Sequence, residues 1–215
     1  DQTGSMGDEI DSVRDNCLAF ADILKSTNMD YRLGLITFSD RIEKNIGFTK
    51  DVKDFKNKIS LIKAYAGGDE PENDLDALNA ARNDKFIKDA KIVFILITDA
   101  PYHQNNRITP LTMLEVIKKI KLEGIKVYPI TINIPQYVWM AKETEGEYFD
   151  ILSDFSSIIE MLAVDLTAQY KISYITSNPS FDNTARNIEL KVKDFSAAKL
   201  KYRSAANITA SSQLY

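Results

Sequence analysis

Apolar residues in the first 170 positions follow two spacings, one typical of buried strands and one typical of helices. Nearly continuous apolar runs, rich in β-branched and aromatic residues, predict strands that are covered on both faces, at 31–38, 91–98 and 125–132. Shorter strands are expected at 42–48 and 147–150. Apolar residues that recur every three or four positions predict helices at 8–24, 50–62, 72–83, 110–122, 136–143 and 153–168. This alternation predicts an α/β fold, with a doubly wound, mostly parallel open sheet flanked by helices.

The pattern changes near residue 170. Segments 170–176 and 187–193 alternate polar and apolar residues, turn-forming residues lie between them, and 199–203 is a candidate third strand. We therefore expect two parts, 1–169 and 170–215. The second part is predicted to be a small antiparallel β extension, with an adjacent β-sandwich as its candidate context.

Oxygen-bearing side chains gather at three points in the first part. Asp1, Thr3 and Ser5 occupy alternate positions before the first helix, Asp69 follows a Gly pair in an acidic loop, and Asp99 follows the apolar run 91–98. In open α/β sheets, ligands bind at the carboxyl ends of the strands. Hard divalent cations prefer oxygen ligands of these types. The sequence therefore predicts a cation site at this edge of the sheet.

These three motifs together resemble the von Willebrand factor type A (vWA) family and its metal-ion-dependent adhesion site (MIDAS), in a variant associated with prokaryotic members. The resemblance implies a Rossmann-like fold and a divalent cation, Mg²⁺ or else Mn²⁺ or Ca²⁺, held by Asp1, Thr3, Ser5, Asp69 and Asp99. It also implies an open coordination position for a Glu or Asp carboxylate of a partner protein. Asp69 stands where the family most often has Thr, and its charge should weaken the pull of the ion on that carboxylate.

In the same family the first motif follows a central apolar strand, and here no residue precedes Asp1. An open sheet without its middle strand leaves backbone groups unpaired. We therefore expect residues upstream of Asp1 to supply the first central strand.

Composition limits the classes of partner. The net charge of −4 arises from mixed signs without a basic block, which argues against nucleic-acid binding. No apolar run approaches the ~20 residues that span a bilayer, so this segment is not expected to insert into a membrane. One Cys and one His exclude zinc sites built from Cys and His clusters.

Enzyme activity is not expected. Ser5 lacks a nucleophile-elbow motif and has only His103 as a candidate base, and no P-loop motif is present. The interpretation that we favour is a metal-dependent adhesion or protein-binding domain, secreted or at a cell surface. Two alternatives stay open: an intracellular assembly module beside an AAA+ ATPase or chelatase, and a scaffold domain whose metal site is vestigial.

Overall fold

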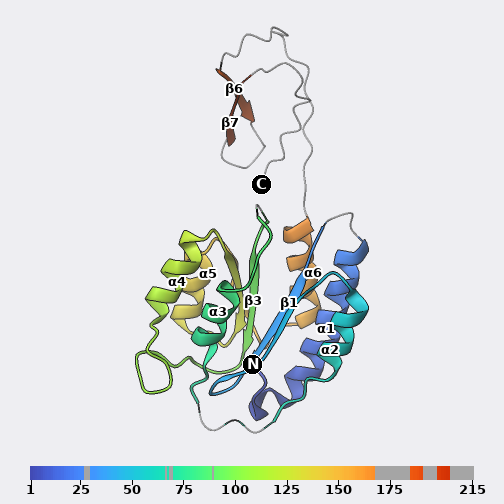
Figure 1. The fold of residues 1–215 in the computed structure, drawn as a ribbon, viewed down its shortest axis with the longest axis vertical. Helices are drawn as coiled ribbons and strands as arrows, with labels where there is room; N and C mark the ends of the chain where they lie inside the picture. Colours follow the sequence, from blue (N-terminus) through green and yellow to red (C-terminus); the bar gives the residue numbers. More distant parts are fainter. Residues whose placement is uncertain are drawn as a thin grey trace. The chain divides into compact units, whose positions relative to one another are not determined.

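The structure is a computed structural model that describes residues 1–26, 30–65, 67, 70–88, 90–167, 185–190 and 198–203. The chain divides into two compact units, Asp1–Thr167 and Ala168–Tyr215. In the first unit (Figure 1), the elements follow in the order η1 (Gly4–Met6), α1 (Gly7–Ser26), β1 (Leu33–Phe38), β2 (Ile42–Thr49), α2 (Val52–Ser60), α3 (Asp74–Arg82), β3 (Val93–Thr98), α4 (Met113–Leu122), β4 (Lys126–Thr131), α5 (Pro135–Glu143), β5 (Phe149–Asp150) and α6 (Phe155–Thr167).

The strands of this unit form two sheets among the described residues. Strands β3, β4 and β5 are parallel, and β3 pairs with β4 from Val93 opposite Lys126 to Thr98 opposite Thr131. Strands β1 and β2 form an antiparallel hairpin. The expected α/β architecture, with a parallel sheet flanked by helices, is confirmed.

The first two residues of the chain connect the carboxyl end of β3 to the carboxyl end of β1. The Asp1 nitrogen donates to the carbonyl oxygen of Ile97 in β3 at 3.0 Å, and the Gln2 amide donates to that of Phe38 in β1 at 2.9 Å. No described strand pairs β1 with β3, so the additional central strand stays a prediction. Residues 1 and 2 therefore hold the first motif at the ends of both strands.

Helices cover both faces of the β3–β4–β5 sheet, with α3, α4 and α5 on one side and α1 and α6 on the other, while α2 lies beside α1 and packs against β1 (Figure 1). Strand β4 contributes to both cores: Val127 packs with α3, α4 and α5, whereas Tyr128 and Ile130 pack with α1 and α6. Both faces of β4 are therefore buried, which explains its nearly continuous apolar sequence.

The helix ends agree with local sequence signals in most places. Thr112 and Glu115 form a capping box at the start of α4. Gly124, at φ 69°, ends the same helix, with the Ile125 amide donating to the Ile120 carbonyl. Helix α6, predicted from residue 153, begins at Phe155, and the Asp154 side chain before it accepts from the Ser157 amide at 3.1 Å.

In the second unit, β6 (Ala185–Leu190) pairs antiparallel with β7 (Ala198–Arg203). The candidate strand 170–176 lies outside the described residues, and the adjacent β-sandwich stays a prediction. None of the helices in the described ranges has the length and apolar character needed to cross a membrane.

Candidate metal site

The first motif folds around the Asp1 carboxylate. Oδ1 of Asp1 accepts hydrogen bonds from the Thr3 amide at 2.9 Å and from the Thr3 hydroxyl at 2.8 Å. Its Oδ2 accepts from the Thr98 hydroxyl at 2.7 Å, at the end of β3. The alternate spacing of the motif thus turns its side chains toward one place, immediately before η1 and α1.

Ser5 joins this motif to Asp99. The Ser5 hydroxyl oxygen lies 3.0 Å from the Thr3 hydroxyl oxygen and donates to Asp99 Oδ1 at 3.1 Å. Four of the five predicted site residues, Asp1, Thr3, Ser5 and Asp99, therefore form one hydrogen-bonded chain, although 94 positions separate Ser5 from Asp99.

The two hydroxyls of Thr3 and Ser5 have too few protons for all the contacts among these four side chains. If Thr3 donates to Asp1 and Ser5 donates to Asp99, no proton remains for the 3.0 Å contact between the two hydroxyl oxygens. Two oxygen lone pairs then face each other next to two carboxylates. This arrangement is unfavourable by itself and suits a cation that both oxygens can coordinate.

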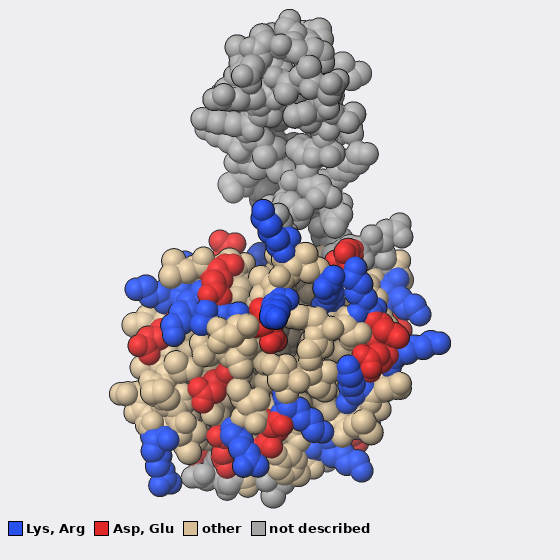
Figure 2. Space-filling view, viewed as in Figure 1, with Lys and Arg blue, Asp and Glu red and all other residues tan. Residues whose placement is uncertain are grey.

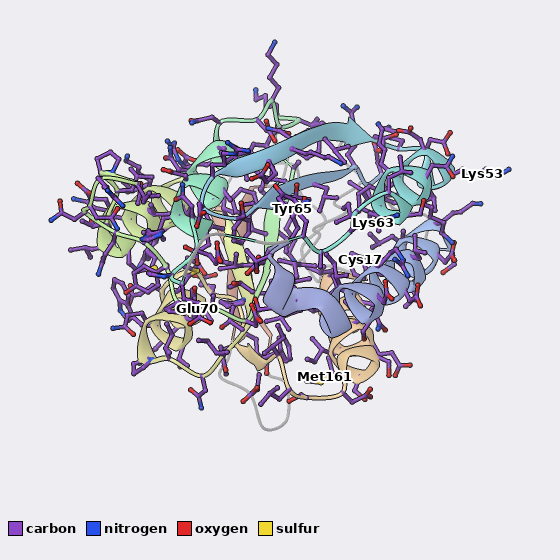
Figure 3. The ribbon with its side chains drawn as sticks, turned by 90° about the horizontal axis from the view of Figure 1, so that it is seen from below. Cys17, Lys53, Lys63, Tyr65, Glu70 and Met161 are labelled. Carbon is purple, nitrogen blue, oxygen red and sulfur yellow. The ribbon has the colours of Figure 1, made fainter. Side chains whose placement is uncertain are left out.

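The loop between α2 and α3 approaches the same motif. The Tyr65 amide donates to the Gln2 carbonyl at 3.1 Å. Gly67 lies so close to Thr3 that a Cβ at this position would be 2.9 Å from Thr3 Cγ2. Asp69, the fifth predicted ligand, lies outside the described residues. Figure 3 views the molecule from below and labels Tyr65 and Glu70, described residues on either side of this part of the loop.

Sequence analysis missed Glu72, which it assigned to the first turn of a helix. Helix α3 begins only at Asp74, because the Glu72 amide donates to the Pro101 carbonyl and the Glu72 carbonyl accepts from the His103 amide, both at 2.8 Å. These bonds attach Glu72 to the loop that follows Asp99. A signal was present in the sequence, since two further acidic residues, Glu70 and Glu72, follow Asp69 and flank Pro71.

The Glu72 side chain is buried, with 3% of the residue exposed, and its Oε2 atom has no hydrogen-bond partner among the described residues. Its Oε1 atom would lie 3.5 Å from a Cβ on Gly67, the same point that Thr3 approaches. Burial, together with the charges of Asp40 and Asp99, raises the pKa of Glu72 to about 7. A buried, unpaired carboxylate next to Asp99 is a further candidate ligand.

His103, the only histidine, is buried and does not serve this site. Its Nδ1 lies 2.8 Å from the Asn106 side-chain nitrogen, within its own loop. Of the described hydrogen bonds of Ser5 and Thr3, none involves His103.

A second buried acid, Asp74, lies beneath the Asp99 loop. It is fully buried at the start of α3, and its Oδ2 accepts from the Tyr137 hydroxyl at 2.7 Å. Burial raises the pKa of Asp74 to about 7, and the Tyr137 hydrogen bond opposes part of that rise.

The pKa values of Glu72 and Asp74 predict how stability depends on pH. Both carboxyls hold a proton up to about pH 7 in the folded protein, but when unfolded they lose it near the ordinary pKa values of Glu and Asp, 4.5 and 3.8. The unfolded state then binds fewer protons, so the unfolding free energy should fall as pH rises from about 5 to 7, by up to about 1.4 kcal/mol per pH unit for each group.

We expect Asp74→Asn to flatten this fall, as measured by chemical denaturation in EDTA across that range. Asp154→Asn is the matched control: hydrogen bonds from Ser157 and Ser156 lower the pKa of Asp154, so its titration lies below the range. The prediction would be contradicted if the unfolding free energies of wild type and Asp74→Asn changed in parallel with pH.

The donor set fits a hard cation better than zinc bound through Cys and His. Within the described part of the chain, no group of three or more His, Cys, Asp or Glu side chains is arranged to hold a metal ion by itself. A cation at this place would therefore also need the hydroxyls of Thr3 and Ser5, and oxygen-only coordination of that kind is typical of Mg²⁺ and Mn²⁺ sites.

Comparison with known proteins agrees with the fold. The sequence profile described as von Willebrand factor A domain matches residues 1–151. Among solved structures, the chain resembles the conserved hypothetical protein BatB from Bacteroides thetaiotaomicron, with 14% identity, a TM-score of 0.57 and coverage of 74% of this chain and 86% of that chain. A comparison with curated proteins finds no match.

A second similar structure is that of proximal thread matrix protein 1 from the mussel byssus, described as having a zinc-occupied MIDAS motif. It has 18% identity and a TM-score of 0.60, over 80% of this chain and 47% of that chain. The chain thus spans about half the length of the mussel protein, and at these identities both likenesses show the fold alone.

Proposed function

Because the chain belongs to the von Willebrand factor A domain family, we propose that its first unit is a metal-dependent protein-binding domain. Asp1, Thr3, Ser5 and Asp99, together with an acid of the loop before α3, hold a divalent cation, Mg²⁺ or else Mn²⁺ or Ca²⁺. The cation supplies a Lewis-acidic position that accepts a Glu or Asp carboxylate of a partner protein.

The observation that carries this proposal is that the Thr3 and Ser5 hydroxyl oxygens are in contact with no proton left to form a hydrogen bond between them. Thr3 and Ser5 bring their oxygens within 3.0 Å while each has a carboxylate to donate to. A vestigial site would have no reason to keep two lone pairs opposed. The zinc-occupied MIDAS motif of the mussel protein adds support from a structure of similar fold.

A hollow that begins one residue after Glu72 offers two arginines to an acidic partner. This shallow hollow of about 520 Å³ includes Asn73, the residue after Glu72, and its charged lining residues are Arg41, Arg107, Asp40 and Asp76. Most of the Arg41 side chain is exposed. Elsewhere on the face seen in Figure 2, basic and acidic side chains are interspersed. Arg41 already pairs with Glu43 at 3.2 Å, so Arg107 is the arginine of the hollow that suits a further acidic residue of the same partner.

The site is suited to binding rather than to catalysis. Ser5 donates to Asp99, and the described hydrogen bonds of Ser5 include none to an imidazole that could act as a general base. The hydroxyls are therefore ligands in this proposal, not nucleophiles.

A short labelled peptide with one central Glu, flanked by glycines, tests the proposal by fluorescence anisotropy. We expect it to bind in Mn²⁺ and to lose binding in EDTA. A Gln counterpart should bind about tenfold or more weakly, equivalent to about 1.4 kcal/mol. Equal binding of the two peptides, or binding that survives EDTA, would refute metal-mediated carboxylate recognition.

A companion peptide with a second Glu tests the role of the hollow. Arg107→Ala should weaken its binding and reduce the salt dependence, because one favourable charge beside the bound segment is lost. Lys53→Ala, at the outer side of α2 (Figure 3), removes the same charge away from the hollow and should leave binding unchanged.

A further inference from the structure

A buried tyrosine contacts the loop that carries Asp99. The hydroxyl of Tyr137, in α5, lies 3.0 Å from the carbonyl oxygen of Ala100, the residue that follows Asp99. The same hydroxyl lies 2.7 Å from Oδ2 of Asp74, in α3. Tyr137, Asp74 and Ala100 are all fully buried. One side chain thus joins two helices to the third motif of the candidate site.

The connection continues to the first motif through Ala100. The Ala100 amide donates to the Thr98 hydroxyl oxygen at 3.2 Å, and that hydroxyl donates to Asp1 Oδ2 at 2.7 Å. The Ala100 amide is therefore bonded to the Thr98 side chain, and the Ala100 carbonyl oxygen lies within hydrogen-bonding distance of the Tyr137 hydroxyl, whose single proton Asp74 and Ala100 share. Tyr137 and Thr98 both contact Ala100, so they hold the turn at Asp99 through the residue that follows it.

Asp74 is costly for a residue that would only satisfy a core tyrosine. The phenol has one proton and two acceptors, so the Ala100 carbonyl alone would satisfy it. Asp74 nonetheless lies fully buried with its Oδ1 atom unpartnered among the described residues. A buried, half-satisfied carboxyl group lowers stability. What it provides is orientation, because a second anchor fixes the Tyr137 hydroxyl against the Asp99 turn.

We propose that Asp74 and Tyr137 are positioning residues of the metal site, and that they hold the Asp99 turn in the geometry that binds the cation. The inference rests on the proposed function. Neither residue touches the ion in this arrangement. They act through Ala100, so their loss should change metal affinity far more than it changes folding.

Tyr137→Phe removes the hydroxyl and keeps the ring, and the chain offers a matched control. Tyr148 also donates its hydroxyl to a backbone carbonyl, that of Thr131 at the end of β4, at 3.0 Å. We expect Tyr137→Phe to raise the Kd for Mn²⁺ about tenfold, within the range for loss of groups that orient metal ligands. Tyr148→Phe should change it less than about twofold. Both should lower the unfolding temperature in EDTA by similar amounts.

Two variants at Asp74 separate orientation from charge. Asp74→Asn keeps a side chain whose amide can donate to the Tyr137 oxygen while Tyr137 donates to the Ala100 carbonyl, and it should retain most of the metal affinity. Asp74→Ala removes the anchor and should match Tyr137→Phe. Equal Kd values for Tyr137→Phe and Tyr148→Phe would overturn the proposal.

Hydrogen exchange in the metal-free protein keeps this test separate from that of the proposed function. Tyr137→Phe should speed amide exchange in segment 99–103, and Tyr148→Phe should not. If wild type binds no Mn²⁺, the proposed function fails, and exchange still decides whether Tyr137 holds the turn. Unchanged exchange in Tyr137→Phe would overturn the positioning role whatever the metal result.

Discussion

Millimolar Mg²⁺ should raise the unfolding temperature of the protein, and Asp99→Ala should abolish the rise. An ion that binds only the folded state stabilises it by about 2.7 kcal/mol at a hundredfold excess over Kd. For a chain of this size that corresponds to roughly 5–10 °C. Asp99 accepts from Ser5, where the first and third motifs meet, so its removal takes away charge and a proposed ligand together. Thermal unfolding with Mg²⁺ and with EDTA measures the effect.

Asp150→Ala is the control for this experiment. Asp150 also lies at the carboxyl end of a parallel strand, β5, but its Oδ1 caps the Leu152 amide and makes no described contact with the site. The Asp150 variant should keep the full Mg²⁺ shift. Absence of a shift in wild type would leave a scaffold domain with a vestigial site, whereas a shift that survives in Asp99→Ala would place the ion elsewhere.

Glu72→Gln should weaken Mg²⁺ binding by about 10–100-fold or more, and by a larger factor than Asp69→Asn. Glu72 is buried and lies near Thr3, and its Oε2 atom has no hydrogen-bond partner among the described residues. The charge of Asp99 helps to raise the pKa of Glu72. With Asp1 and Asp99, Glu72 already supplies three negative charges for a divalent ion. A fourth carboxylate from Asp69 would add mostly repulsion. Titration calorimetry of each variant gives the Kd values.

Glu70→Gln is the matched control, because Glu70 is an exposed residue of the same loop. It should leave the Kd nearly unchanged. The metal-free unfolding temperature of Glu72→Gln should not fall, since the substitution removes repulsion from Asp40 and Asp99. A larger loss in Asp69→Asn than in Glu72→Gln would show that Asp69 is the ligand from this loop.

The predicted elements correspond closely to those of the structure because their signals are local. Strand β4 was recognisable because both of its faces are buried, and α4 because Thr112 and Glu115 form its cap. The start of α3 was placed too early, since Pro71 and Glu72 resemble a first helical turn. In the structure Glu72 bonds to Pro101 and His103 instead. Those partners lie about 30 positions away, and no local pattern contains them.

The sequence by itself determined the α/β class and brought Asp1, Thr3, Ser5 and Asp99 to one edge of the sheet. Strand order and the alternate spacing of the first motif suffice for that, because parallel strands end on the same side. Only the tertiary structure showed that Glu72 lies buried beside Asp99 and that Tyr137 links Asp74 to the Asp99 turn. These roles depend on burial and on contacts between separate elements, which determine whether a carboxylate is solvated, unpaired or used as an anchor.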